Sequence, residues 1–417
     1  MIGTLHLDPA RHPNEGSSVK LASRMERIGT ETAFEAAARA RALEGTGRDV
    51  IHLEIGEPDF DTPRNVSEAA ARALLDEGAT HYTAATGIQP LREAIVADVK
   101  RWKGIDTTPE QVVVTPGAKP IMFYAMLALV EDGDEVIYPN PGFPIYESMA
   151  RYVGGVPIAA PLREANDFRM DVDEVAGLIT DRTKLLVFNT PHNPTGSILT
   201  HDDIRRLAEL AMEHDLVVLA DEIYGRLQYE GEPLSIATLP GMAERTITLD
   251  GFSKTFAMTG WRMGYGILPE WLVASFSRLV INSVSCTNAF AQAGAVEALT
   301  GPQDEVDAYR TEFIARRSLM VDGLNAIPGI TCRMPHGAFY AFPNVTSFGR
   351  TSAEIADHLL YDSGVCGLAG TAFGAHGEGY LRFSYANSRE NLSLALERVA
   401  ASLAKLDRTG ELVGAAS

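Results

Sequence analysis

One lysine stands in the segment "LDGFSKTFAMTGWRMGYGI" (249–267), in a loop rich in small residues. Lys254 follows a short apolar run, and Arg262 comes eight positions later. A lysine amine with an ordinary pKa of about 10.4 is protonated at neutral pH and is a poor nucleophile. Desolvation or cationic neighbours lower that pKa, and the neutral amine can then form a Schiff base with an aldehyde. Because a solvated lysine needs no such surroundings, we predict that Lys254 is a reactive amine.

Other polar motifs follow predicted strands at their carboxyl ends. Asp221 in "DEIYG" follows the apolar run "LVVLA", and Asn193 in "HNPTG" follows "KLLVFNT". A further motif, "PGAK" (116–119), follows "QVVVT". Parallel strands end at one edge of their sheet, where ligands of α/β proteins bind. We therefore expect these motifs and Lys254 to converge on one site.

The elements that position these motifs are short β-branched runs that alternate with helical patterns. The helical pattern "HDDIRRLAELAMEHD" has Asp202 and Asp203 in its first turn, where the helix dipole favours acidic residues. Continuous apolar strands that alternate with helices predict an α/β fold, with a mostly parallel sheet flanked by helices on both faces. The expected strands are residues 111–115, 135–139, 184–190, 216–224 and 246–251.

The two ends of the chain have a different pattern. Residues 20–55 contain one helical pattern and one strand, and residues 305–405 contain helices and short strands. These segments predict a second, smaller α+β domain that is built from both chain ends. The expected division is a flexible leader at 1–20, a small domain at 21–60 and 305–417, and a large domain at 61–304.

The composition restricts the class of protein. At 417 residues, with 46% hydrophobic and 22% charged residues, the chain is typical of a soluble globular protein with a large core. A formal net charge of −19 argues against nucleic acid or an anionic membrane as the main partner, although a small anion can still bind locally. We find neither an apolar run of membrane-spanning length nor a secretory signal. The three cysteines have no metal-ligand or disulfide spacing, so we expect a cytoplasmic protein without a metal.

Seven motifs taken together closely resemble the class I/II aminotransferase family, the pyridoxal-phosphate (PLP) enzymes of fold type I. They extend from Leu53 to Ala386, nearly the whole chain, and none of them is specific alone. The resemblance implies that PLP binds in the large domain and that the substrates are an amino acid and a 2-oxo acid. In the order of the family the motifs are "LEIGEPDFDTP", "HYTAATGIQPLREAI", "TPGAK", "NTPHNPTG", "LADEIYG", "SKTFAMTGWRMGY" and "GEGYLRFSYA".

The resemblance implies catalytic roles for Lys254, Asp221 and Tyr224. Lys254 would hold PLP as a Schiff base and then move a proton on the substrate. Asp221 would keep the pyridine nitrogen of PLP protonated. Tyr224 and Asn193 would donate hydrogen bonds to the 3′-oxygen of the ring. From the residues alone, a helix N-cap at Asp221 and a plain turn at Asn193 remain open alternatives.

The resemblance also implies a site for the phosphate of PLP. Gly117 and Ala118 open a helix whose free N–H groups and dipole favour an anion. Arg262 adds a permanent cation. The family often has a Ser or Thr ligand three residues before the lysine, and this chain has Gly251 there instead. Ser253 is the candidate replacement.

Two further residues complete the implied cofactor contacts. Phe143 falls where the family stacks an aromatic ring on PLP, and packing in the core is its alternative role. Tyr82 resembles the tyrosine that reaches the phosphate from the neighbouring subunit. The resemblance therefore implies a homodimer.

Some of the implied substrate contacts bind the α-carboxylate that all amino acids share, and others distinguish between side chains. Arg382 resembles the arginine that binds the α-carboxylate bidentately, and the backbone of Gly56 and the side chain of Asn193 belong to the same region. Lys119, next to the implied phosphate site, corresponds in some acidic-substrate members to a lysine that reaches the distal carboxylate. It could equally point to solvent. The loop "VSCTNAF" (284–290) carries no arginine, so we expect no second carboxylate clamp from it.

These features predict an aminotransferase that acts on an L-amino acid and a 2-oxo acid, with aspartate, alanine and 2-oxoglutarate types favoured. The alternative is a PLP enzyme that starts from the same Schiff base and acts as a lyase, a replacement enzyme, a cyclising enzyme or an oxidase. A PLP-sensing regulator is disfavoured, because such proteins carry a basic DNA-binding domain before the PLP domain.

Overall fold

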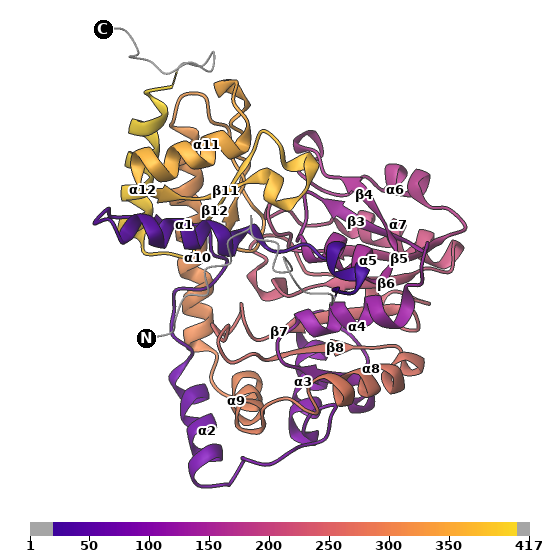
Figure 1. The fold of residues 1–417 in the computed structure, drawn as a ribbon. Helices are drawn as coiled ribbons and strands as arrows, with labels where there is room; N and C mark the ends of the chain where they lie inside the picture. The colour runs from indigo at the N-terminus through magenta and orange to yellow at the C-terminus, as the bar shows by residue number, and fades with distance from the viewer. Residues whose placement is uncertain (1–19, 407–417) are drawn as a thin grey trace, which may run out of the picture.

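The computed structural model describes residues 20–406, so the expected leader at 1–20 lies outside the described residues except for Lys20. Within this range one sheet of seven strands has the order β2-β8-β7-β6-β5-β3-β4, with helices on both faces (Figure 1). The predicted α/β fold is confirmed. The strands of this sheet are β2 (Val112–Thr115), β3 (Glu135–Asn140), β4 (Val156–Pro161), β5 (Thr183–Asn189), β6 (Val217–Asp221), β7 (Thr246–Gly251) and β8 (Gly264–Ile267).

Twelve α-helices lie within the described residues, and five of them, α4 to α8, follow a strand of the large sheet. Their bounds are α1 (Thr32–Glu44), α2 (Arg64–Leu75), α3 (Gln89–Lys103), α4 (Lys119–Leu129), α5 (Ile145–Val153), α6 (Val172–Leu178), α7 (His201–Glu213), α8 (Glu270–Ser283), α9 (Ala289–Thr300), α10 (Asp304–Asn325), α11 (Ser352–His358) and α12 (Arg389–Leu403).

Both faces of the sheet are buried because successive side chains of a strand point to opposite sides. In β5, Leu185 and Val187 belong to the core that includes α4, α5 and α8. Leu186 and Phe188 belong to the core that includes α6 and α7. A strand buried on both faces is a continuous apolar run, which is why the sequence indicated the central strands.

Helix α7 shows how local sequence sets an element's start. The hydroxyl of Thr200 accepts a hydrogen bond from the backbone N–H of Asp203 at 3.1 Å, and the Asp203 carboxylate accepts one from the N–H of Thr200 at 2.8 Å. This capping box satisfies two N–H groups that the first helical turn leaves free. The helix begins at His201, as the sequence predicts.

Strands β4 and β8 were not among the predicted strands. Strand β8 is antiparallel to β2 and β7, and it contains Gly264 and Gly266 and no β-branched residue before Ile267. Strand β4 has two prolines and lies at the edge of the sheet, where a missing N–H leaves no ladder bond unmade. Strand β6 ends at Asp221, so the predicted strand at 216–224 was too long.

Short strands from distant parts of the chain form two small sheets beside the large one. Strand β1 (Ile51–His52) pairs with β10 (Val365–Cys366), and β9 (Tyr340–Ala341), β12 (Leu381–Ser384) and β11 (Leu368–Ala369) form the other sheet. Helix α1 lies beside β10, β11 and the other C-terminal elements (Figure 1). The domain boundaries at 21–60, 61–304 and 305–417 stay a prediction. No helix within residues 20–406 has both the length and the apolar character needed to cross a membrane.

Candidate active site

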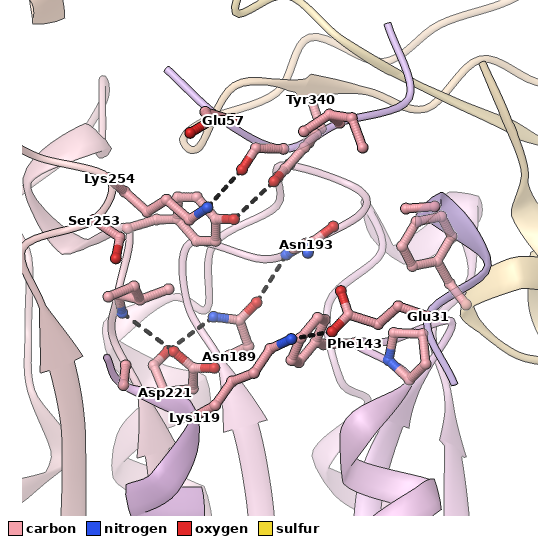
Figure 2. A pocket seen from close by; sticks show the side chains of 18 of the residues that line it. Glu31, Glu57, Lys119, Phe143, Asn189, Asn193, Asp221, Ser253, Lys254 and Tyr340 are labelled. Carbon is pink, nitrogen blue, oxygen red and sulfur yellow. Dashed lines mark hydrogen bonds and ion pairs between the residues drawn. The ribbon is translucent and has the colours of Figure 1, made fainter. Parts of the chain in front are cut away.

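The strand ends meet at one cavity, as the topology predicts. Asn189, Asp221 and Gly251 are the last residues of the neighbouring strands β5, β6 and β7. Figure 2 shows side chains from these ends, from the start of α4 and from the small sheets pointing into one space. The cavity has a volume of about 450 Å³. The predicted site residues that line it are Gly56, Ala118, Lys119, Phe143, Asn193, Asp221, Tyr224, Ser253, Lys254, Arg262 and Arg382.

The amine of Lys254 points into the cavity. Its Nζ donates a hydrogen bond to the carbonyl oxygen of Gly56 at 2.5 Å and lies 5.8 Å from the centre of the Phe339 ring (Figure 2). Burial lowers the pKa of Lys254 to about 8, and the positive charges of Arg382 and Lys119 act in the same direction. Burial outweighs the opposing negative charge of Glu57, so the structure gives this lysine the desolvated surroundings that make an amine nucleophilic.

Asp221 lies on the floor of the cavity, buried at the end of β6. Its carboxylate accepts hydrogen bonds from the Tyr146 hydroxyl at 2.6 Å and from the backbone N–H of Ile223 at 3.2 Å. Burial raises its pKa to about 6, although both hydrogen bonds oppose that shift. The next helical turn has Tyr224 as its N-cap, so the alternative role of Asp221 as a helix N-cap is wrong.

A chain of hydrogen bonds joins the floor of the cavity to Arg382. The side-chain amide of Asn189 donates to the carbonyl oxygen of Asp221 at 2.9 Å, and its Oδ1 accepts from the backbone N–H of Asn193 at 2.8 Å (Figure 2). The Oδ1 of Asn193 then accepts from Nη1 of Arg382 at 3.1 Å. The turn that begins at Asn193 therefore positions the side-chain amide of Asn193. The turn and the role in the site are thus compatible and are not alternatives.

Arg382 is 4% exposed and is held by flat aromatic neighbours. Its guanidinium lies 4.4 Å from the ring centre of Tyr340 and 4.7 Å from that of Phe373, and Nη2 donates to the carbonyl oxygen of Glu54. Burial lowers its pKa, but an arginine stays protonated at any working pH. Its buried Nε has no hydrogen-bond partner among the described residues, so the group retains capacity for an anion.

The hydroxyl of Tyr340 contacts both Tyr224 and Gly56. The hydroxyls of Tyr224 and Tyr340 are 2.8 Å apart, and both side chains are buried. A Cβ on Gly56 would lie 2.0 Å from the Tyr340 hydroxyl, so only glycine fits at this position. The backbone of Gly56 contacts Lys254, whereas Arg382 contacts the backbone at Glu54.

A cradle of small residues forms where α4 begins beside β8. Gly117 has a φ of +84°, and a Cβ there would lie 2.1 Å from Nη2 of Arg262. A Cβ on Gly264 would lie 2.3 Å from the backbone nitrogen of Ala118. The missing side chains let the arginine and the N-terminus of the helix approach each other closely. Backbone N–H groups, a helix dipole and an arginine together form a site suited to a phosphate.

Ser253 lines the cavity, whereas Gly251 does not. A Cβ on Gly251 would lie 3.0 Å from Cα of Gly264 and 3.3 Å from the side chain of Ile223. A side chain at position 251 would therefore crowd the pairing of β7 with β8. Of the two candidates for a hydroxyl near the phosphate cradle, only the serine is present.

Lys119 lines the cavity and is paired within the chain, and its contact with the distal carboxylate of a substrate stays a prediction. Its Nζ forms an ion pair with the carboxylate of Glu31 and lies 5.3 Å from the centre of the Phe143 ring (Figure 2). Phe143 is half-buried on the cavity wall, and its ring packs edge-on against Tyr146 at 5.8 Å. The lysine thus lines the cavity, and the carboxylate of Glu31 already neutralises its charge.

Tyr82 lies outside the cavity of this chain. Its side chain is 88% exposed. The next residue, Thr83, donates its backbone N–H to Sγ of Cys286 at 3.5 Å, so the Tyr82 loop lies against the segment 284–290. Within one chain neither of these two loops lines the cavity.

A buried charge cluster lies behind the floor of the cavity. Nζ of Lys103 is 2.7 Å from a carboxylate oxygen of Glu222 and 2.6 Å from one of Asp250, and the lysine side chain is 9% exposed. Burial alone would lower the pKa of Lys103, but the two carboxylates raise it well above its ordinary value. One cation therefore joins the residue after Asp221 to the penultimate residue of β7.

Sequence reasoning missed several residues of the cavity. Tyr340, Glu31 and Asn189 line it, and Tyr146 supports Asp221 from behind. Tyr146 could have been found, because it lies three residues after Phe143 at the start of a helical pattern. No local signal marks Glu31 or Tyr340, since both reach the cavity only through the tertiary fold.

Comparison with known proteins identifies the family. A family model described as aminotransferase class I and II matches residues 48–399. The chain belongs to this family. It is 40% identical to the aromatic-amino-acid aminotransferase 2 of Thermococcus litoralis, over 91% of this chain and 97% of the relative. It is 42% identical to an aspartate aminotransferase of Pyrococcus abyssi, over 84% and 91%. The aspartate aminotransferase of Thermus thermophilus, solved with maleate, superposes with a TM-score of 0.89 at 38% identity, covering 92% of this chain and all of that one.

The family membership confirms the predicted enzyme class and cofactor. Class I and II aminotransferases use PLP and exchange an amino group between an amino acid and a 2-oxo acid. The residues of the cavity fit PLP, because a reactive amine, a buried carboxylate and a phosphate-sized cradle surround one space. The names of the relatives favour transamination over the lyase, replacement, cyclising and oxidase alternatives.

Proposed function

We propose that this aminotransferase takes a dicarboxylic amino donor, L-aspartate or L-glutamate, and a 2-oxo acid of the 2-oxoglutarate type. The observation that carries the proposal is Lys119, whose amine lies in the cavity and already binds a carboxylate there. Opposite to it, Arg382 is available for the α-carboxylate. Two cations at separate places suit a ligand with two carboxylates. The aspartate aminotransferases among the relatives support the same substrate class.

Arg382 and Asn193 are the proposed contacts of the α-carboxylate, with the backbone at Gly56 beside them. The guanidinium lies over the rings of Tyr340 and Phe373, so it loses little conformational entropy when it binds a planar carboxylate. Its bond to Asn193 fixes the direction of its donors. The α-carbon of the substrate would then lie on the side of the cavity where Lys254 projects.

Lys254 is the proposed acid–base residue, with Asp221 and Tyr224 as the groups that tune the cofactor. PLP, when bound, supplies an electron sink for the bonds at the substrate's α-carbon. Lys254 would bind the cofactor covalently and, once released from it, carry a proton to and from that carbon. The Asp221 carboxylate would pair with the protonated ring nitrogen, and the Tyr224 hydroxyl and Asn193 amide would donate to the 3′-oxygen. The positive ring nitrogen would offset the cost of a charged carboxylate at this buried position.

The proposed phosphate site combines Gly117, Ala118, Ser253 and Arg262, with the backbone N–H of Lys119 nearby. Phe143 is the proposed stacking partner of the ring, since it lies on the cavity wall. The edge-on contact of its ring with Tyr146 leaves a face of Phe143 available for this role.

We also propose a homodimer in the cytoplasm, with Tyr82 reaching the phosphate of the neighbouring subunit. The exposed Tyr82 and Leu75, the latter 78% exposed at the end of α2, support this interface. Large aromatic and aliphatic side chains of this kind are favoured where a partner covers them. The small domain at 21–60 and 305–417 would carry Arg382, and the large domain at 61–304 would carry PLP.

The lowered pKa of Lys254 predicts how cofactor uptake depends on pH. A group with a pKa of about 8 is neutral in about a tenth of the molecules at pH 7, against fewer than about one in a thousand for an ordinary lysine. The neutral amine is the nucleophile, and its share reaches one half near pH 8 and levels off above about pH 9. We expect the rate of PLP uptake by cofactor-free protein, followed by absorbance, to rise between pH 6 and 8 and to be flat above 9. A rate that keeps rising to pH 10.5 would show an unperturbed lysine.

A substrate screen with Lys119→Met tests the proposed substrate class. A charge-assisted hydrogen bond is worth about 1.5–3 kcal/mol, so kcat/KM for aspartate and glutamate should fall about 10- to 100-fold in the variant. Alanine has no distal carboxylate, so its kcat/KM should change less than about threefold. Equal losses on both classes, or no loss, would contradict the distal-carboxylate role. Ammonia release without a 2-oxo acid would indicate a lyase.

A further inference from the structure

The carboxylate of Glu31 enters the cavity from the N-terminal part of the described chain. It forms the ion pair with Lys119, and its side chain is only 17% exposed, against 47% for the lysine. Figure 2 shows the two side chains meeting beside Phe143, on the opposite side of the cavity from Lys254. A carboxylate of the protein therefore binds the cation that we propose for the distal carboxylate of the substrate.

The segment before α1 is fixed so that Glu31 reaches this place. The backbone N–H of Gly29 donates to the hydroxyl of Ser148 on α5 at 2.8 Å, and that hydroxyl lies 3.4 Å from the carbonyl oxygen of Gly29. The guanidinium of Arg27 donates to the carbonyl oxygen of Tyr152, also on α5, at 3.3 Å. These contacts hold the chain against the large sheet's helix just before it enters α1.

The position of Glu31 at the start of α1 does not explain why a glutamate occurs there. Glu31 is the N-cap of α1, where Ser, Thr, Asp or Asn would normally satisfy a free N–H group. Its side chain makes no capping hydrogen bond. The longer glutamate instead extends to Lys119. Its negative charge is also a lesser cause that opposes the lowering of the pKa values of Lys254 and Arg382 by burial.

We propose that Glu31 is a specificity-determining residue that competes with the distal carboxylate of a substrate for Lys119. A dicarboxylic ligand must displace Glu31, so its affinity is reduced by the share of molecules in which the ion pair is closed. A ligand with an uncharged side chain leaves the pair in place and meets a neutralised lysine. The enzyme would thereby accept both classes and bind dicarboxylates less tightly than its lysine alone would allow.

The apolar side chains of the cavity are consistent with ligands whose side chain is uncharged. Phe143, Ile55 and Phe373 line the same cavity. An unpaired ammonium beside such a surface would disfavour an aromatic or aliphatic side chain, because a charge is costly to desolvate. The closed pair removes that cost. This inference rests on the proposed function, since it assumes that Lys119 receives the distal carboxylate.

Binding of unreactive ligands to the PLP-loaded enzyme tests the inference. Succinate represents a dicarboxylate and 3-phenylpropionate a ligand with one carboxylate and an aromatic side chain, and calorimetry gives both dissociation constants. In Glu31→Gln the competitor is neutral, so succinate should bind at least about tenfold more tightly. The affinity for 3-phenylpropionate should not rise. The ratio of kcat/KM for aspartate to that for phenylalanine should increase in parallel.

Glu35→Gln is the matched control, because Glu35 is an exposed glutamate one turn further along α1 and does not line the cavity. It removes the same charge from the same helix and should leave both dissociation constants within about twofold. A succinate affinity in Glu31→Gln that is unchanged or weaker, or a gain of equal size in Glu35→Gln, would overturn the inference. Failure of the proposed function is visible separately in the wild-type enzyme, as an absence of 2-oxo acid-dependent transfer from any dicarboxylic donor.

Discussion

Replacing Lys254 by alanine should reduce the rate of amino transfer by at least about 10³-fold, because general acid–base catalysis by one residue contributes about 10²–10⁴-fold and the covalent attachment of PLP is lost as well. The amine lies inside the cavity with a pKa lowered to about 8, and Lys119, the next cation along the cavity, is occupied by Glu31. Lys119 is therefore held in an ion pair and is not free to replace the proton transfer of Lys254. Steady-state rates with aspartate and 2-oxoglutarate measure the loss.

A small free amine provides the control for this variant. Methylamine fits the space that the lysine side chain leaves, and millimolar concentrations should restore part of the rate in Lys254→Ala and none in the wild type. Thermal unfolding of the cofactor-free protein should change little, because removing a desolvated amine leaves no buried charge unpaired. Wild-type rates in Lys254→Ala would contradict the assigned role.

Mixing variants connects this residue to the proposed dimer. Subunits with Lys254→Ala still offer Tyr82, and subunits with Tyr82→Ala still offer Lys254. If Tyr82 acts across the interface, mixed dimers contain one site with both native residues. The activity of the mixture after subunit exchange should then exceed the mean of the two separate variants. Activity equal to that mean would place Tyr82 outside the partner's site.

Replacing Asp221 by asparagine should reduce kcat by about 10²–10³-fold, the usual cost of removing one preorganised electrostatic group. Asparagine keeps the shape of the side chain, and its one oxygen can accept from Tyr146 but not also from the N–H of Ile223. It also cannot carry the negative charge that a protonated ring nitrogen requires. Because burial raises the pKa of Asp221 to about 6, the charged carboxylate is disfavoured in the cofactor-free protein. Removing the buried charge should offset the loss of the hydrogen bond from Ile223, so the cofactor-free variant should be about as stable as the wild type, while its kcat falls.

Tyr146→Phe is the comparison that separates charge from hydrogen bonding. It removes the 2.6 Å hydrogen bond to Asp221 and leaves the carboxylate in place. One hydrogen bond to a charged group is worth about 1.5–3 kcal/mol, part of which the bound cofactor compensates, so the loss in kcat should be below about tenfold. A larger loss in Tyr146→Phe than in Asp221→Asn would show that the hydrogen bond matters more than the charge.

The sequence predicted the parts of the fold that have a periodic signal. Strands such as β5 and β6 are buried on both faces and are continuous apolar runs, so they were found. Strand β8 was missed because close packing against the start of α4 requires glycine at position 264, and glycine is depleted in strands. The order of the strands was not predictable, since it depends on crossovers that no local pattern records.

The residues of the site were likewise predictable where they follow a strand and unpredictable where they depend on contacts between distant segments. Lys254, Asp221 and Asn193 follow predicted strands, so the rule that ligands bind at strand ends was sufficient to group them. Glu31 comes from a segment 88 residues away from Lys119 in sequence, and its contribution depends on how Ser148 holds Gly29. Such contacts between distant segments are properties of the tertiary structure, and a single sequence does not show them.

The buried cation behind the cavity holds the strand ends that carry the catalytic groups in fixed positions relative to each other. Lys103 binds the residue after Asp221 and the residue before Gly251, so it fixes the ends of β6 and β7 at one height. Its raised pKa keeps it charged across the whole range in which Asp221 and Lys254 change protonation. Proton movements during turnover should therefore change the charges in the cavity but not the distances between the groups that carry them.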